Sequence, residues 1–157
     1  MARHFKLTNE TKINIFGVTL FRIECTIDCK WAKVGDKGGW VEKEDNLSGN
    51  AWVSGNAEVY GNAEVYGNAA VSGNARVYGN AEVSGNADYC CFQSFGSCGR
   101  TTTAFKEKDG NIRIRCGCFD GNIEEFAAKV EQTHGDNEYG KVYKAIIEVI
   151  KLKFNVK

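Results

Sequence analysis

The chain has 157 residues, 43% of them hydrophobic, and its 20 Lys and Arg residues balance its 20 Asp and Glu residues. The charge is balanced along the chain as well, so no segment supplies the basic face that non-specific nucleic-acid binding requires, and we do not expect nucleic acid as a partner. No apolar run approaches the length of a bilayer span, and MARHFKLTNETK does not resemble a signal peptide. We therefore expect a cytoplasmic protein that does not bind membranes.

The first segment, residues 1–45, predicts a β-hairpin that closes one end of the structure. Two runs rich in β-branched and aromatic residues flank Gly17 in TKINIFGVTLFRIECTI. The tryptophans Trp31, Trp40 and Trp52 gather where the next segment begins, which is typical of a hydrophobic plug. We interpret this segment as a cap, and a ligand-stacking platform formed by the tryptophans is the alternative.

A six-residue repeat occupies the second segment, residues 46–88. Its unit reads Ala-x-Val-(Tyr/Ser)-Gly-Asn. Alternating Ala and Val predict a short strand with one buried face, and Gly-Asn predicts a turn because both residues adopt left-handed backbone angles at low cost. One unit cannot bury its apolar face alone, so successive units are expected to stack.

The spacing of this repeat, in which an aliphatic residue is followed four places later by a small one, resembles that of hexapeptide-repeat proteins. The resemblance implies a triangular coil with about eighteen residues per turn, so that Tyr60 stacks on Tyr78 and Glu58 on Arg76. The expected fold is mainly β: a short left-handed parallel β-helix, or hexapeptide solenoid, capped by the N-terminal hairpin.

The outward positions of the repeat are the ones left to recognise a partner. Exposed tyrosines with few charges around them commonly pair between copies of a chain. We therefore predict a homo-oligomer and a protein interface formed by Tyr60, Tyr66, Tyr78, Glu58 and Arg76.

Trimeric acyltransferases are the best-known enzymes with hexapeptide repeats, so acyl transfer is the enzymatic alternative. Those enzymes rely on a histidine base, and the two histidines of this chain, His4 and His134, both lie outside the repeat. The repeat region is also short for a cleft between subunits. We therefore expect binding rather than catalysis, with no catalytic residue.

The third segment, residues 89–157, predicts a ββαα module, the small α+β part of the fold. Two alternating runs flank Asp109–Gly110, which is a strong hairpin signal. Asn122 has the pattern of a helix N-cap, and that helix is expected to end near His134. A second helix is expected to start around Asn137, with apolar residues at helical spacing.

Two stretches resemble uncharacterised bacteriophage and prophage proteins. They are GDKGGWVE followed by the GNA repeats, and CGCFDGNIEEFAAKVEQTHGDNEYGKVY, Cys116 to Tyr143. Phage genomes keep small non-enzymatic proteins that antagonise host defence. The resemblance therefore implies a binding or scaffold protein in the host cytoplasm, which antagonises a host defence system by binding a protein complex and has a host or phage protein as its partner. A sponge that sequesters a small anionic nucleotide signal is the alternative.

One region has the residues to bind a small anion. The Gly-containing loop QSFGSCGR can present backbone amides to an anion, and cationic and polar side chains are expected nearby. We predict that this ligand site is formed by Ser97, Arg100, Arg113, Arg115, His134 and Tyr139.

The seven cysteines form an odd and closely spaced set, which favours reduced thiols over a disulfide framework. Cys116 and Cys118 lie two apart, and with Cys90, Cys91 and Cys98 they are weak candidates for a zinc site. The chain has no C-x-x-C pair and the spacings are irregular, so we expect no metal and no cofactor.

Overall fold

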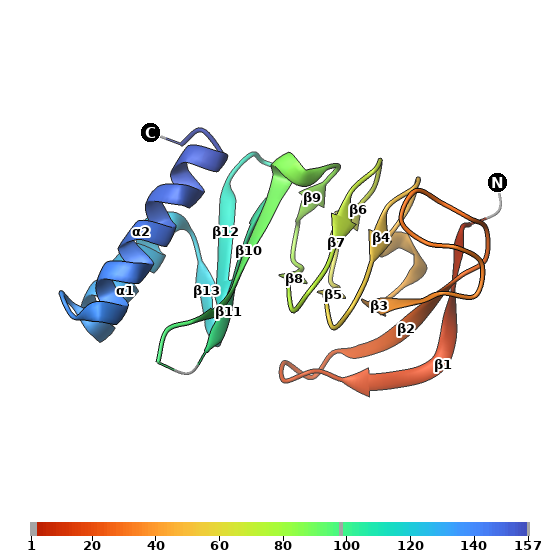
Figure 1. Cartoon of the computed structure of the whole chain (residues 1–157), viewed down its shortest axis with the longest axis horizontal. Helices are drawn as coiled ribbons and strands as arrows, with labels where there is room; N and C mark the ends of the chain where they lie inside the picture. The colour runs from red at the N-terminus through yellow and green to blue at the C-terminus, as the bar shows by residue number, and fades with distance from the viewer. Residues whose placement is uncertain (1–2, 98, 157) are drawn as a thin grey trace. The chain divides into compact units, whose positions relative to one another are not determined.

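The computed structural model describes residues 3–97 and 99–156 (Figure 1). It consists of two compact units, one up to Asn86 and one from Ala87 onward. Among the described residues, both α-helices belong to the second unit, and the first unit contains strands and the one-turn 3₁₀ helix η1 (Glu44–Asn46). A second 3₁₀ turn, η2 (Asn86–Asp88), follows the repeat. Neither helix in the described part of the chain has the length and apolar character needed to cross a bilayer.

The predicted N-terminal hairpin is confirmed. Strand β1 (Phe5–Ile13) pairs antiparallel with β2 (Thr19–Cys25), which in turn pairs antiparallel with β3 (Lys37–Val41). In the turn, Asn14 Oδ1 accepts hydrogen bonds from two backbone N–H groups of the loop, at 2.9 and 3.0 Å. Gly17 adopts a φ of 81°, a value that side-chain-bearing residues rarely adopt.

Each repeat contributes a strand of two residues, and these strands pair in parallel with strands eighteen residues away. Glu58 pairs with Arg76, and Val59 with Val77, as the repeat spacing predicts. The hydrogen bond from Tyr60 N to Val77 O, 3.0 Å, continues this ladder past the strand end. The strands are β4 (Trp52–Val53), β5 (Glu58–Val59), β6 (Glu64–Val65), β7 (Ala70–Val71), β8 (Arg76–Val77) and β9 (Glu82–Val83).

The predicted left-handed β-helix with a separate cap is wrong, although the mainly β class is confirmed. The described residues of the first unit form several small sheets, with strand orders β1-β2-β3-β5-β8, β4-β7 and β6-β9. Because β3 pairs antiparallel with β2 and parallel with β5, the hairpin continues the same sheet as two repeat strands and is not a separate cap. Gly-Asn turns interrupt the chain after every two strand residues, so the repeat yields separate short ladders.

The inward-facing Ala and Val residues of the repeat form much of the core of the first unit, together with hairpin residues such as Leu20 and Ile23. These Ala and Val side chains are fully buried, which matches the predicted inward face. The Gly-Asn turns also stack closely: a Cβ at Gly61 would lie 3.0 Å from the backbone nitrogen of Gly79, and Gly61 has a φ of 67°. Glycine is therefore required there by both its backbone angles and the space available.

The second unit is a four-stranded antiparallel sheet with two helices on one face (Figure 1). The predicted ββαα module is wrong, because the sheet has two further strands, β10 and β13. The sequence did not indicate them, since β10 lacks a clear polar-apolar alternation and β13 has only three residues. The hairpin across Asp109–Gly110 is confirmed. The elements are β10 (Tyr89–Phe95), β11 (Arg100–Lys106), β12 (Ile112–Cys116), β13 (Phe119–Gly121), α1 (Ile123–His134) and α2 (Glu138–Lys153).

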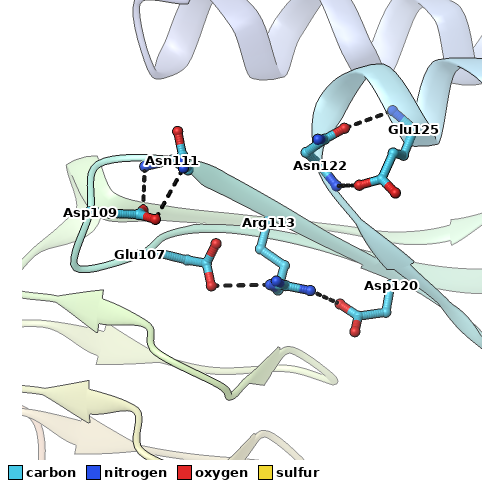
Figure 2. Close-up of polar contacts among 7 residues, drawn as sticks. All are labelled: Glu107, Asp109, Asn111, Arg113, Asp120, Asn122 and Glu125. Atoms are coloured by element: carbon cyan, nitrogen blue, oxygen red, sulfur yellow. Dashed lines mark hydrogen bonds and ion pairs between the residues drawn. The ribbon is translucent and has the colours of Figure 1, made fainter.

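Both helices begin where the sequence predicts. At the start of α1, Glu125 N donates to Asn122 Oδ1 at 2.8 Å, and Asn122 N donates to Glu125 Oε1 at 3.0 Å (Figure 2). This reciprocal pair is a capping box. At the start of α2, Gly140 N donates to Asn137 Oδ1 at 2.9 Å. The caps fix where each helix starts, and the apolar rows of the helices face the sheet.

Candidate ligand-binding pocket

The second unit contains a cavity of about 600 Å³ between its helices and the β12–β13 end of its sheet. Arg100, the first residue of β11, and Phe119, the first residue of β13, both line this cavity. Helix α1 supplies the largest share of the lining, and α2 contributes Tyr143. The cavity therefore collects side chains from segments that are far apart in the sequence.

Aromatic rings form one wall of this cavity. His134 stacks on Tyr143 with ring centroids 5.7 Å apart and planes 17° apart. Phe126 meets Tyr143 edge-on at 5.8 Å, and Phe119 lies 5.1 Å from Phe126. A wall of this kind suits a flat, apolar or heteroaromatic group.

Tyr143 is held in place by buried neighbours. Thr102 Oγ1 donates to Cys116 Sγ at 3.2 Å, and the Cys116 thiol donates to the Tyr143 hydroxyl at 3.7 Å. The Tyr143 hydroxyl also lies so close to Gly96 that a Cβ at that position would collide with it. The aromatic wall is therefore fixed before any ligand arrives, which lowers the entropic cost of binding.

Two cationic side chains, Arg100 and Lys129, line the same cavity. The Arg100 guanidinium lies over the turn after β12, where a Cβ on Gly117 would be 3.0 Å from its Nη1. Within the described part of the chain, neither cation forms an ion pair. Asp120 is the one carboxylate of the lining, and its Oδ1 already accepts a hydrogen bond from Arg113 at 2.8 Å. The cavity therefore has positive charge available for an anionic group.

The sequence of α1 explains why its polar residues face the cavity. Phe126 and Val130 are buried against the sheet, and Lys129 and Thr133 flank this row one helical turn apart. His134 lies four residues after Val130, at the end of the helix, and is half-buried. The row formed by Phe126, Val130 and His134 thus changes from apolar to polar toward the end of α1.

The structure brings together part of the predicted anion site. Arg100 and His134 both line the cavity. Tyr139 contacts the His134 ring with centroids 5.6 Å apart, but it does not line the cavity. Ser97 is exposed and also lies outside the lining.

Arg113 and Arg115 were predicted to belong to this site, but they lie on the sheet face away from the helices. The partners of Arg113 are acidic: its Nε donates to Glu107 at 3.1 Å and its Nη1 to Asp120 at 2.8 Å (Figure 2). The hydrogen bond to Asp120, followed by that to Glu107, raises the pKa of Arg113. Arg115 is itself buried. Arg113 and Arg115 lie two residues apart on β12 and therefore share one face of the sheet. The cavity lies on the opposite face, under the helices, so the predicted grouping is wrong.

A smaller cavity of about 380 Å³ lies beside Glu107, Arg113 and the start of α1. Its polar groups already bond to one another (Figure 2). Asn111 donates from its backbone and its side chain to the Asp109 carboxylate, at 2.9 and 3.0 Å, and Glu125 belongs to the helix cap. This arrangement stabilises the β11–β12 turn and the helix start, so the larger cavity is the better candidate.

The predicted protein interface on the repeat is largely buried. Tyr60 and Tyr78 are 6% and 7% exposed, and their rings stack at 5.3 Å. Glu58 is also buried: Lys12 Nζ lies 3.0 Å from one of its carboxylate oxygens, and Asn14 donates to the other at 3.1 Å. The prediction that these side chains project into solvent is therefore wrong, because Tyr60 and Tyr78 pack on each other and the β1–β2 hairpin lies over Glu58.

The two remaining interface residues are partly exposed. Arg76 Nε lies 3.6 Å from Glu58, and its guanidinium lies 5.6 Å from the Phe16 ring in the hairpin turn. The Tyr66 hydroxyl donates to Glu82 at 3.1 Å. These contacts hold both side chains against the first unit, which leaves less of the predicted surface for a partner.

The cysteines do not gather into a metal site within the described ranges. Those residues contain no group of three or more His, Cys, Asp or Glu side chains placed to hold a metal ion. Cys116 and Cys118 both line the cavity, and the Cys116 thiol is engaged with Thr102 and Tyr143. Cys90 and Cys91 are half-buried free thiols. Cys98, the fifth residue of the predicted zinc set, lies outside the described residues.

Several cavity residues were not singled out from the sequence as site residues. Phe126 and Tyr143 follow the apolar rows of the two helices and therefore predicted only a core. Lys129 and Thr133 gave a weak signal, since both lie beside the buried row of α1 on a helical wheel.

Comparison with known protein families and with curated proteins finds no match. The resemblance to phage and prophage proteins therefore stays a prediction.

Proposed function

We propose that this chain is a non-enzymatic binding protein whose second unit binds a small anionic ligand with a planar ring. The observation that carries the proposal is the meeting of two cations and a fixed aromatic wall in one cavity. A planar ring stacks on the half-buried His134, which Tyr143 supports from its other face, while a phosphate or carboxylate bonds to Arg100 and Lys129. A nucleotide has both features.

Sequestration of a nucleotide signal is the biological role we propose for this site. It follows from the expected kinship with phage proteins, and binding alone is enough to perform it. The other expected role, blocking of a host protein complex through Tyr60 and Tyr78, has less support because those rings are buried.

The proposal is tested by isothermal titration calorimetry of the full chain with a panel of purine and pyrimidine mononucleotides and cyclic dinucleotides. Adenosine and inorganic phosphate serve as probes of the two halves of the ligand. We expect at least one nucleotide to bind more tightly than either half alone. Arg100→Ala and Lys129→Ala should each weaken that binding about tenfold or more, because each removes a charge-assisted hydrogen bond.

Lys33→Ala is the matched control, because Lys33 is an exposed cation of the first unit. It should leave the affinity unchanged. Failure of every nucleotide to bind, or an affinity that is indifferent to Arg100, would overturn the proposed function.

A further inference from the structure

Helix α2 carries a second apolar stripe that its own unit does not cover. Its core-facing residues, such as Tyr143 and Ile150, are buried against the sheet and α1. On the outer face, apolar residues recur at intervals of three, four and three residues, which keeps them in line along a helix. They are exposed, with Val142 at 39%, Val149 at 48% and Leu152 at 81%; the stripe comprises Val142, Ala145, Val149 and Leu152.

We propose that this stripe is the seam of a dimer in which the α2 helices of two copies of the chain pack antiparallel. An isologous pair of this kind uses the same surface on both copies. When the helices cross at Ala145, Val142 of each copy lies beside Val149 of the second copy. Tyr139 then lies beside Leu152 of the second copy, and the apolar stripe is covered along its length.

The charges beside the stripe favour this orientation. In the antiparallel pair, Lys141 of each copy lies beside Glu148 of the second copy, and Glu138 lies beside Lys153. Lys141 and Glu148 lie seven residues apart and therefore share one flank of α2. In a parallel pair this flank would face the opposite flank of the second copy, so the two opposite charges would not meet across the seam. The sequence of α2 therefore selects the antiparallel arrangement over the parallel one.

The centre of the stripe fits a close helix crossing. Ala145 has the smallest apolar side chain of the stripe and lies next to the midpoint of the contact from Tyr139 to Leu152, where the two backbones come nearest. Lys144 does not compete for the charges at the seam, because it is paired within its own chain. Its Nζ lies 2.9 Å from Glu131 and 3.0 Å from Asp136.

The expected dimer is a weak one. A helix of 16 residues is about 24 Å long, and one pair of such helices buries less than the roughly 1,600 Å² of a stable interface. We therefore expect a dissociation constant in the range of about 10 µM to 1 mM. Sedimentation velocity of the full chain should show a monomer at low concentration and a growing dimer fraction over this range.

Val149→Glu should abolish the dimer, because it buries a charge in the seam. Val34→Glu is the matched control: Val34 is 63% exposed and lies in the first unit. The Val34→Glu variant should form the dimer to the same extent as the original chain. A monomer at every concentration, or a dimer that survives Val149→Glu, would overturn the proposal.

A charge exchange tests the orientation separately. Lys141→Glu alone and Glu148→Lys alone should each weaken the dimer about fivefold or more, since each places like charges opposite each other in the antiparallel pair. The double variant should recover it, and so should an equimolar mixture of the two single variants. Circular dichroism at 222 nm verifies that α2 stays helical. Loss of dimer in the double variant or in the mixture would refute antiparallel pairing.

Discussion

Gly96 shows how one residue without a side chain can position another. It adopts a φ of 83°, and the Tyr143 hydroxyl occupies the space where a Cβ would be. A side chain at this position would be strained and would also displace the tyrosine. The aromatic wall of the cavity therefore depends on a glycine that does not itself line the cavity.

Gly96→Ala should lower the free energy of unfolding of the second unit by about 2 kcal/mol or more, through backbone strain and displacement of Tyr143. Gly110→Ala is the matched control, because Gly110 has a φ of 88° and open space around its Cα. It should cost about 1 kcal/mol, from backbone strain alone. Urea unfolding followed at 222 nm measures both. Equal losses in the two variants would contradict the steric role of Gly96.

At the scale of elements, the β1–β2 hairpin lies over the part of the repeat that contains Glu58. One repeat later, Glu64 occupies the equivalent position and is exposed. The two glutamates have the same place in the repeat, and they differ because Lys12 and Asn14 of the hairpin reach only the first. The role of an outward position therefore depends on which distant segment lies over it.

Glu58→Gln should destabilise the first unit by about 1 to 3 kcal/mol, because it leaves Lys12 and Arg76 without their buried counter-charge. Glu64→Gln should change the stability by less than about 0.5 kcal/mol, as expected for a surface site. Chemical unfolding followed by tryptophan fluorescence reports the difference. If the two variants lost the same stability, the Glu58 contacts would not stabilise the hairpin on the repeat.

The helix starts, the turns and the burial of Glu58 show which features the sequence could predict and which it could not. The helix starts at Asn122 and Asn137, the turn at Asp109–Gly110 and the eighteen-residue pairing were predictable, because each depends on residues close in sequence or on strict repetition. The burial of Glu58 was not predictable, because the hairpin that covers it is more than forty residues away. Arg100 and His134 were predicted for the cavity, but Lys129 and Tyr143 were not, since only the packing of helices on the sheet selects them.

At the scale of the whole molecule, each unit has its own core and its own spectroscopic reporter. The three tryptophans all precede Asn86, and both α-helices follow Ala87. Tryptophan fluorescence therefore reports the first unit, and ellipticity at 222 nm reports mainly the second. The two signals can be followed in one unfolding experiment.

Ile150→Ala should lower the stability of the second unit by about 2 to 5 kcal/mol, because Ile150 is fully buried in the core under the helices. The 222 nm transition should move to lower urea concentration, while the tryptophan transition should stay in place. For Val65→Ala, at a fully buried position of the repeat, the tryptophan transition should move to lower urea concentration and the 222 nm transition should stay in place. A joint shift of both transitions in either variant would show that the units unfold as one.

The pairing of strands eighteen residues apart also limits how the repeat can change in length. Loss of one six-residue unit between β3 and β5 would place Glu64 where Glu58 now pairs with Trp40, and the next strand in that ladder would then present Glu82 in place of Arg76. Glu64 would then lie beside the carboxylate of Glu82, where Glu58 now lies beside the guanidinium of Arg76. Loss or gain of three units would instead keep every remaining strand in its own ladder, because paired strands are eighteen residues apart. Length variants of this region are therefore expected to differ by multiples of three repeats.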